Sequence, residues 1–449
     1  MSVVSVTSVV PEEIVDAGHE RMLERVCAID VGKQSAKVCT RLPGGSAGRR
    51  VSRVWDVVAT TRAVTELADQ LVRVRVEKVT IESTSDYWRI WFYLLEARGL
   101  DVRLVNARDV KNVPGRPKTD KLDAVWLAKL TERGMLRPSF VPPPAVRVLR
   151  DYTRLRVDLT HDRTRHWQRL EKLLEDSLIK VSSVVSTLDG VSVRAMLEAL
   201  IAGERDPRVL AGLARARLRS KHTALVEALT GRFDDHHGAL ARILLDQIDS
   251  LDATIDQLTG RIDQHIATIP AAQKPGGGGD GGGSTAAVPA VTRLDEIPGV
   301  GLIGAQTILA EVGFDMSQFP TPQHLAAWAK LVPRTIQSGT RHRTGKTGKG
   351  NPYLKGALGN AAATAARTNT FLGERYRRLV KRRGKLKALV AIARSILIIV
   401  WHLLADPTTR FRDLGPDHHT NRIDKDKRTR THIRQLEALG YTVTLNPAA

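Results

Sequence analysis

The chain has 449 residues, which is enough for about three domains with cores of their own. Lysine and arginine number 69 against 48 aspartates and glutamates, so the formal net charge is +21. This excess favours a polyanionic partner such as nucleic acid. Residues 1–11 lack the basic stretch of a secretory signal, and the longest apolar run, residues 395–405, is too short to span a bilayer. We therefore expect a buried helix there, a cytoplasmic protein and no membrane partner.

The N-terminal third has the pattern of an α/β domain. Residues 1–21 are expected to form a flexible extension, and residues 22–144 alternate β-type runs with helical patterns. Strands are expected near residues 25–31, 36–40, 51–55, 78–81 and 102–105, and helices over 62–72, 87–97 and 121–133. Pro138 and the prolines at 142–144 end the domain. The only two cysteines, Cys27 and Cys39, fall on neighbouring strands and are expected to be reduced core residues.

Four carboxylates in this domain could form a site. Asp30 ends one apolar run, Glu82 ends another, and Asp120 and Asp123 share one face at the start of an expected helix. Carboxylates crowded together repel one another and normally need a cation. Mg²⁺ suits hard oxygen ligands, and a pair of such ions is the usual clamp for phosphodiester chemistry. A nucleic-acid enzyme is the first hypothesis, and solvated surface acids are the competing interpretation.

Residues 145–270 are expected to be helical. Near the end of this segment, apolar residues alternate spacings of four and three, which predicts a coiled-coil seam made of Leu244, Ile248, Leu251, Ile255, Leu258 and Ile262. A leucine-rich stripe between residues 149 and 178 offers a partner for this seam. An intramolecular antiparallel hairpin and a dimerisation stalk both fit the pattern.

A glycine run at residues 276–284 predicts a flexible linker over residues 271–290, which would let the next domain reach a site on another protomer. Residues 291–405 are expected to form a mainly helical domain, and residues 406–449 a basic polar tail that is ordered only in part. Residues 297–305 match the hairpin of a helix-hairpin-helix element. Gly299 and Gly301 would let backbone N–H groups approach a phosphate, although a turn between packed helices is the competing interpretation.

Positive charge concentrates in this C-terminal domain. Between Leu331 and Lys387 there are fifteen lysines and arginines and one acid, Glu374. A charge run is usually a solvated face, but this density predicts a phosphate-binding surface whose affinity falls as salt rises. The residues expected to bind nucleic acid, beside the two glycines, are Arg334, Arg341, Arg343, Lys346, Lys349, Arg375, Arg377, Arg378, Lys381, Arg382, Arg383, Lys385 and Lys387.

Ser338 lies in the loop that begins this basic run. A Ser-Gly pair alone is most often a turn, and a serine nucleophile needs a base or a metal to activate it. No carboxylate occurs between Asp315 and Glu374, so a metal would have to come from elsewhere, most naturally from the N-terminal carboxylates. The loop also resembles a P-loop, but Thr340 replaces the first glycine and the strand-loop-helix context is missing, so ATP binding is not expected. The paired histidines at 236–237 and 418–419 lack the spacing of zinc ligands.

Taken together, these residues resemble the DEDD-type insertion-sequence transposases, the serine-using recombinases that are guided by a structured bridge RNA. The resemblance extends over most of the chain. Its motifs are residues 28–33, 81–83, 87–88, 118–124, 297–301, 331–334, 337–339, 349–354 and 391–394. Residues 83–86 depart from the usual Ala-Thr-Gly after the glutamate, and the linker and N-terminal extension are unusual.

The resemblance implies an RNase H-like (RuvC-like) N-terminal domain, a helical coiled-coil middle and a mainly α C-terminal transposase domain. It implies that Asp30, Glu82, Asp120 and Asp123 bind Mg²⁺, with two ions per active site, and that Ser338 attacks DNA to leave a covalent phosphoserine link. It further implies donor and target DNA, a structured non-coding guide RNA, and dimers that assemble to a tetramer with composite sites between protomers.

We therefore expect a metal-dependent DNA recombinase. Two alternatives stay open. One is a structure-selective endonuclease, like a Holliday-junction resolvase, in which water attacks and Ser338 only makes a turn. The other is a non-catalytic scaffold that binds nucleic acid through its basic surface.

Overall fold

The computed structural model describes residues 23–44, 49–83, 85–107, 120–273, 288–339, 341–421 and 425–445. The expected N-terminal extension and the glycine run of the expected linker lie outside the described residues. The chain divides into two compact units, Met1–Val141 and Pro142–Ala449.

A mixed five-stranded sheet of order β3-β2-β1-β4-β5 forms the centre of the N-terminal unit. The first three strands in the chain are antiparallel neighbours, whereas β1, β4 and β5 run parallel. All five predicted strands are confirmed, but β2 and β3 continue beyond their predicted ends because their antiparallel pairing runs from Ser35 with Val58 to Pro43 with Arg50. The strands are β1 (Val26–Val31), β2 (Ser35–Pro43), β3 (Arg50–Val58), β4 (Lys78–Ser83) and β5 (Val102–Asn106).

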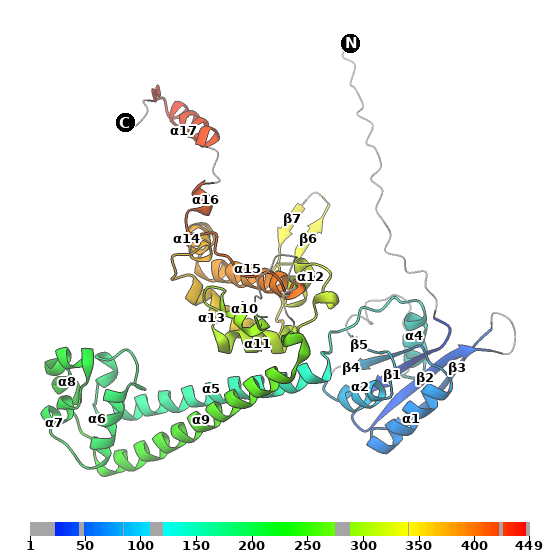
Figure 1. The fold of residues 1–449 in the computed structure, drawn as a ribbon, viewed down its shortest axis with the longest axis horizontal. Helices are drawn as coiled ribbons and strands as arrows, with labels where there is room; N and C mark the ends of the chain where they lie inside the picture. Colours follow the sequence, from blue (N-terminus) through cyan, green and yellow to red (C-terminus); the bar gives the residue numbers. More distant parts are fainter. Residues whose placement is uncertain are drawn as a thin grey trace, which may run out of the picture. The chain divides into compact units, whose positions relative to one another are not determined.

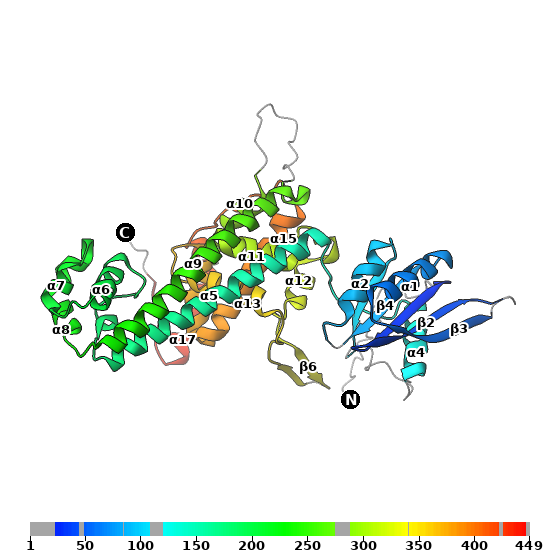
Figure 2. The same cartoon turned by 90° about the horizontal axis from the view of Figure 1, so that it is seen from below.

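Helices cover both faces of this sheet (Figures 1 and 2). Helices α1 (Thr61–Arg73) and α2 (Trp88–Ala97) pack with Cys27 and Ile29 of β1. Helix α4 (Asp120–Glu132) packs on the opposite face, against Val26 and Ala28. This alternation is what a strand buried on both sides requires. The α/β prediction is confirmed, and a mixed sheet between helices fits an RNase H-like domain.

Both cysteines are buried and free, as predicted. Cys39 is paired with Ala28 and belongs to the α4 face, whereas Cys27 belongs to the α1–α2 face. Burial raises the pKa of the Cys27 thiol and raises the pKa of Cys39 to about 11. Both side chains are therefore packing residues rather than nucleophiles.

Two long helices, α5 (Pro144–Asp176) and α9 (Asp235–Thr268), lie side by side along most of their length in the second unit (Figure 2). They are antiparallel, because His265 near the end of α9 contacts the carbonyl of Ala145 at the start of α5, at 2.8 Å. The two helices therefore form the intramolecular antiparallel hairpin, which was one of the two expected arrangements beside a dimerisation stalk. The coiled-coil interpretation of the apolar spacing stays a prediction.

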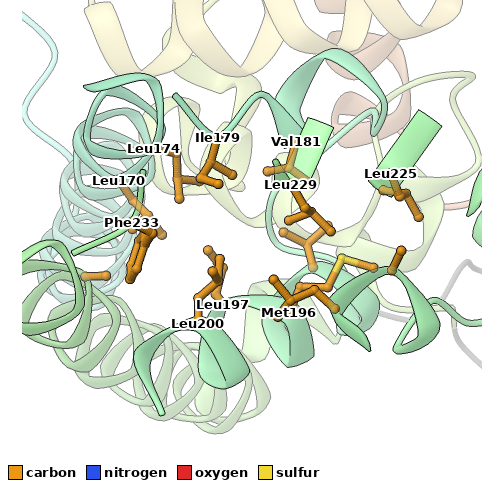
Figure 3. Packing of buried hydrophobic residues seen from close by; sticks show 14 of the residues in the cluster. Leu170, Leu174, Ile179, Val181, Met196, Leu197, Leu200, Leu225, Leu229 and Phe233 are labelled. Atoms are coloured by element: carbon orange, nitrogen blue, oxygen red, sulfur yellow. The ribbon is translucent and has the colours of Figure 1, made fainter. Parts of the chain in front are cut away.

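The far ends of these helices are capped by a small helical cluster, whose leucine-rich core is shown in Figure 3. Met196, Leu197 and Leu200 of α6 pack there against Leu170 and Leu174 of α5. The elements of the cap are η1 (Val181–Ser183), α6 (Val191–Ile201), α7 (Pro207–Gly212), η2 (Ala216–Lys221) and α8 (His222–Leu229).

The rest of the unit is a helical body built around α15 (Lys385–Ala405), which packs against α10, α12, α13 and α14. Among the described helices, α15 alone is long and apolar enough to cross a membrane. However, its Ile392, Ile396 and Val400 are fully buried in the body, so the predicted core helix is confirmed. The other elements are η3 (Pro270–Ala272), α10 (Ala290–Asp295), α11 (Leu302–Val312), η4 (Met316–Gln318), α12 (Pro322–Trp328), β6 (Thr335–Ser338), β7 (Arg341–Thr344), α13 (Pro352–Ala365), α14 (Phe371–Arg383), α16 (His418–Asn421) and α17 (Lys425–Ala438).

A buried carboxylate joins the long helices to this body. Glu311 of α11 is fully buried and accepts two parallel hydrogen bonds from Arg154 of α5, at 2.7 and 2.9 Å. Arg150 lies 3.3 Å from the same carboxylate and also donates to the carbonyl of Ala310. The side-chain amide of Asn351, which caps α13, is another donor to Glu311. Four donor groups, three from helix α5 and one from the cap of α13, thus compensate one buried charge.

A second polar network reinforces the same junction. Arg156 of α5 is almost fully buried and donates to the amide oxygen of Gln306 at 2.7 Å. The amide nitrogen of Gln306 in turn donates to Asp263 of α9 at 2.6 Å. Burial lowers the pKa of Arg156 to about 10, and the charge of Asp263 opposes this shift. Since Gln306 lies on α11, this network holds helices α5, α9 and α11 in one fixed arrangement.

We predict that Glu311→Ala lowers the free energy of unfolding by roughly 3–5 kcal/mol, because it leaves Arg150 and Arg154 without their shared anion. Denaturant unfolding of the full chain measures this loss. Asp249→Ala is the matched control, since its ion pair with Arg194 is half-exposed and should contribute less than about 1 kcal/mol. Equal losses in the two variants would contradict the role given to Glu311.

Candidate active site and basic surface

Strand register places two of the predicted carboxylates side by side. In the parallel pairing of β1 with β4, Asp30 stands directly opposite Glu82, as Ala28 stands opposite Thr80. Directly paired residues project from the same face of a sheet, and Ala28 packs against α4. Asp30 and Glu82 therefore belong to the α4 face, at the carboxyl end of the two strands. The side chain of Asp30 is half-buried, and Glu82 is only 6% exposed.

Helix α4 brings a third carboxylate to this end. The carbonyl of Glu132, at the last residue of α4, accepts a hydrogen bond from the N–H of Leu23, just before β1, at 3.0 Å. The helix therefore runs opposite to β1, and both elements span about 20 Å. Its first turn consequently reaches the end of β1 that carries Asp30. Asp123 lies there one turn before Leu127, which is fully buried against the sheet.

The structure thus gathers Asp30, Glu82 and Asp123 at one end of the α4 face, which we call the acidic edge. Asp120 is the first residue of α4, so its backbone belongs to the same turn. The edge presents oxygen ligands, one of them almost buried, from two strands and a helix. Such a donor set fits Mg²⁺ better than softer metals. These residues could hold the predicted ions, and their role as ligands stays a prediction.

Another group of possible metal ligands lies at the start of α9, where atoms of Asp234, His236 and His237 all fall within 4.8 Å. The backbone N–H of Asp234 donates to Nδ1 of His237 at 3.1 Å, and the two residues form a capping box at the start of the helix. This local contact accounts for their proximity. The group therefore has a structural explanation that needs no metal.

Ser338 is the last residue of β6, at the tip of a β-hairpin that extends from the helical body (Figure 1). Gly339 follows it with a φ of 57°, and the register pairs Ser338 with Arg341. Positive φ at this position is what short hairpins require. Residues 332–334 form no strand, as expected, and strand β7 occupies Arg341–Thr344 within the stretch that resembles a P-loop. A P-loop is therefore excluded.

The base of the hairpin is attached to the Glu311 network. A two-stranded hairpin is marginal by itself, so its position depends on its attachments. The N–H of Gly345 donates to the carbonyl of Arg334 at 2.6 Å and closes the base. A few residues later, Asn351 caps α13 and donates to Glu311. The buried carboxylate thus anchors the segment that carries Ser338.

The two glycines of the predicted helix-hairpin-helix differ in their surroundings. A Cβ added at Gly299, whose φ is 89°, would lie 2.3 Å from the carbonyl oxygen of Ala361 on α13. Close packing therefore explains Gly299, which favours the competing interpretation at that position. Gly301 precedes α11 with a φ of 53° and has open space around it. Its approach to a phosphate stays a prediction.

The predicted nucleic-acid-binding residues fall into three groups. Arg377 is engaged by Glu374 at 3.1 Å, and Arg375 and Arg378 are half-buried on α14. Beside Arg375 lies Arg394 of α15, which is not among the predicted nucleic-acid-binding residues. The remaining residues are exposed: Arg334, Arg341, Arg343, Lys346, Lys349, Lys381, Arg382, Arg383, Lys385 and Lys387.

Comparison with known proteins identifies two matching family models. Residues 27–179 match the DEDD transposase model of IS110 elements, and residues 291–377 match the transposase model of the IS116/IS110/IS902 family. The two matches together cover just over half of the chain. They include the acidic edge, the hairpin with Ser338 and the start of α14.

Two curated relatives are similar over a shorter stretch. The transposase for insertion sequence element IS1111A of Coxiella burnetii is 34% identical over 122 residues, which is 26% of this chain and 33% of the relative. An uncharacterised 43.6 kDa protein of insertion element IS110 from Streptomyces coelicolor is 36% identical over 118 residues, which is 26% of this chain and 29% of the relative. The similarity thus spans about a third of each relative.

Among solved structures, Thermus thermophilus RuvC is similar at 15% identity, over 26% of this chain and 99% of RuvC. The TM-score is 0.20, a value that does not establish a shared fold.

We predict that Mg²⁺ raises the melting temperature of the full chain and that Asp30→Asn or Glu82→Gln removes most of this effect. At a concentration a hundred times the dissociation constant, binding stabilises a folded protein by about 2.7 kcal/mol. Asp69→Asn is the matched control, because Asp69 is a half-exposed acid on α1, outside the acidic edge. The same Mg²⁺-induced shift in Asp30→Asn as in the wild type would rule out the acidic edge as the metal site.

Proposed function

Since this chain belongs to the IS110 family of DEDD transposases, we propose that it is a DNA transposase that cuts and exchanges the strands of an insertion sequence. The observation that carries the proposal is the register that sets Asp30 beside Glu82, under the first turn of α4. Oxygen ligands that converge at a sheet end are what a metal-dependent phosphoryl-transfer site requires. The N-terminal unit would then be an RNase H-like catalytic domain.

In this proposal, Asp30, Glu82, Asp120 and Asp123 would hold two Mg²⁺ ions. The bound metal would polarise the phosphate and favour the deprotonated form of an attacking hydroxyl. The half-buried position of the edge keeps its carboxylates in a fixed geometry before DNA binds. Pre-organisation of this kind lowers the reorganisation needed in the transition state.

Ser338 is the proposed nucleophile. Its oxygen would replace one ester oxygen at phosphorus, and the departing DNA strand would leave as a free hydroxyl, so that the serine stays linked to the phosphate. Attack by the hydroxyl of another strand would reverse the step and join new ends. Arg341, paired with Ser338 across the hairpin and exposed, is suited to neutralise charge at the phosphate. Because Ser338 and the acidic edge belong to different units, the site would be composite.

The partners in this proposal are donor DNA, target DNA and a structured guide RNA that selects them by pairing. The exposed basic residues of the C-terminal unit support a nucleic-acid partner, since their charges would neutralise backbone phosphates. A homodimer that assembles into a tetramer would supply composite sites from neighbouring protomers. A cytoplasmic location is part of the same proposal.

We predict that Ser338→Ala keeps nucleic-acid binding but forms no covalent protein–DNA adduct and exchanges no strands. Denaturing electrophoresis of labelled DNA detects the adduct. Thr344→Ala, which removes a hydroxyl from the other end of the same hairpin, is the control and should keep adduct formation. Strand exchange at the wild-type level in Ser338→Ala would refute the nucleophile assignment.

The same assay separates the alternatives. Mg²⁺-dependent nicking without any adduct in the wild type would favour the water-using endonuclease. A non-catalytic scaffold would show no cleavage, and Asp30→Ala and Ser338→Ala would leave every activity unchanged.

Guidance by RNA has its own test. We expect recombination between two plasmids that carry the ends of the element only when the RNA encoded beside the gene is supplied. Changing the pairing segment of that RNA should redirect the target site. Recombination that is equally efficient without the RNA would contradict this part of the proposal.

A further inference from the structure

Three arginines gather where α14 meets α15. Arg375 and Arg378 lie three residues apart on α14, and Arg394 lies on α15. Gly384 separates the two helices, and Arg375 and Arg394 lie at similar distances from it in the sequence. Each side chain is half-buried. Burial lowers the pKa of Arg375, and the neighbouring charges of Arg378 and Arg394 lower it further. We call these residues the arginine triad.

Within the described part of the chain, the triad arginines have neither an ion pair nor a side-chain hydrogen bond, whereas Arg154 and Arg156 have at least one. The Nε–H groups of all three residues, and one terminal nitrogen of Arg378, are shielded from solvent and have no acceptor among the described residues. The described ion pairs also omit all three. The nearby carboxylate of α14, Glu374, is engaged by Arg377. By contrast, Arg154 is paired with Glu311, and Arg156, whose Nε also lacks an acceptor among the described residues, donates to Gln306 through a terminal nitrogen.

This arrangement is unfavourable unless an anion completes it. Buried N–H groups are nearly always satisfied in folded proteins, and clustered like charges repel. A guanidinium presents its N–H groups as a planar fork that matches two oxygens on one phosphorus atom. A phosphodiester supplies both the negative charge and the acceptors, whereas a neutral ligand would supply only acceptors.

We propose that Arg375, Arg378 and Arg394 form a binding site for a single backbone phosphate of nucleic acid. The site deepens the proposed function and rests on it. It differs from the exposed lysines and arginines at the end of α14, which attract nucleic acid at many positions without fixing any one of them. A recessed site instead holds one phosphate at one place and so sets the position of the strand along the helical body.

Inorganic phosphate is the first probe, because it needs no nucleic acid. At constant ionic strength, sodium phosphate should raise the melting temperature of the full chain by about 1–2 °C relative to chloride when phosphate is at ten times its dissociation constant. Arg394→Gln should lose this shift. Arg383→Gln removes an exposed charge from the end of α14 and should keep it. Retention of the full shift in Arg394→Gln would overturn the site.

The same variants test whether the triad has only a structural role. If it binds an external phosphate, Arg394→Gln should be no less stable than the wild type without phosphate, because one repulsive charge is gone. Arg394→Lys, which keeps the charge but not the planar fork, should restore part of the phosphate shift. A large drop in melting temperature for both variants, with no phosphate effect in the wild type, would show that the triad is satisfied by the chain itself.

Affinity for labelled duplex DNA and labelled RNA of equal length identifies the natural ligand. Arg394→Gln should weaken binding to at least one of them by roughly 10- to 100-fold, as expected for lost charge-assisted hydrogen bonds. Arg383→Gln should weaken it much less. A wild type that binds neither DNA nor RNA would contradict the proposed function. If Arg394→Gln binds nucleic acid as tightly as the wild type does, this result would contradict the triad site but not the proposed function.

Discussion

The parallel register of β1 and β4 is the constraint on which the candidate active site depends. It sets Asp30 opposite Glu82, and it is held by burial on both faces of the sheet. Ile29 and Ile81 are buried under α1 and α2, whereas Ala28 faces α4. A slip by one residue would move Glu82 into the apolar α1–α2 core and place Ile81 beside Asp30. The hydrophobic alternation therefore determines where the carboxylates meet, although none of the apolar residues takes part in chemistry.

The second unit depends in a similar way on one buried charge. Glu311 holds α5 through Arg150 and Arg154 and holds the start of α13 through Asn351. The hairpin with Ser338 begins and ends near these anchored helices, so a carboxylate with no role in chemistry fixes its base. Acidic residues thus serve two purposes in this chain. Those of the acidic edge lie together at the end of two strands, whereas Glu311 is buried among donors from α5 and the cap of α13.

Much of the fold could be predicted from the sequence, because strands such as Val26–Val31 and helices such as Thr61–Arg73 have clear apolar periodicity. Parallel register could not be predicted, since it arises from contacts between segments some fifty residues apart, as in Asp30 with Glu82. The prediction that Gly299 approaches a phosphate met a different difficulty. Its pattern is shared by phosphate-binding hairpins and by close helix packing, and only the position of Ala361 separates the two.

The residue types of the candidate site could be predicted from the sequence, but the burial and the neighbours of each residue could not. Acids at the ends of apolar strands pointed to Asp30 and Glu82, whereas nothing local distinguishes Glu311 from a surface glutamate. The arginines of α14 illustrate the same limit. In sequence they form one basic run, but their environments differ in the fold. Arg377 is paired with Glu374, Arg383 is exposed, and Arg375 is half-buried beside Arg394. Burial and neighbours, which differ among adjacent residues of one helix, decide what each charge can do.

The central claim is that the acidic edge and Ser338 act on the same phosphorus atom, and a metal-specificity switch tests it most directly. Sulfur in place of a non-bridging oxygen at the cleaved phosphate weakens contact with hard Mg²⁺ more than with softer Mn²⁺. The account predicts that the covalent adduct with Ser338 falls on this DNA in Mg²⁺, recovers in Mn²⁺, and is absent with either metal in Asp30→Asn. Equal adduct yields in both metals, or an adduct that forms without Asp30, would contradict it.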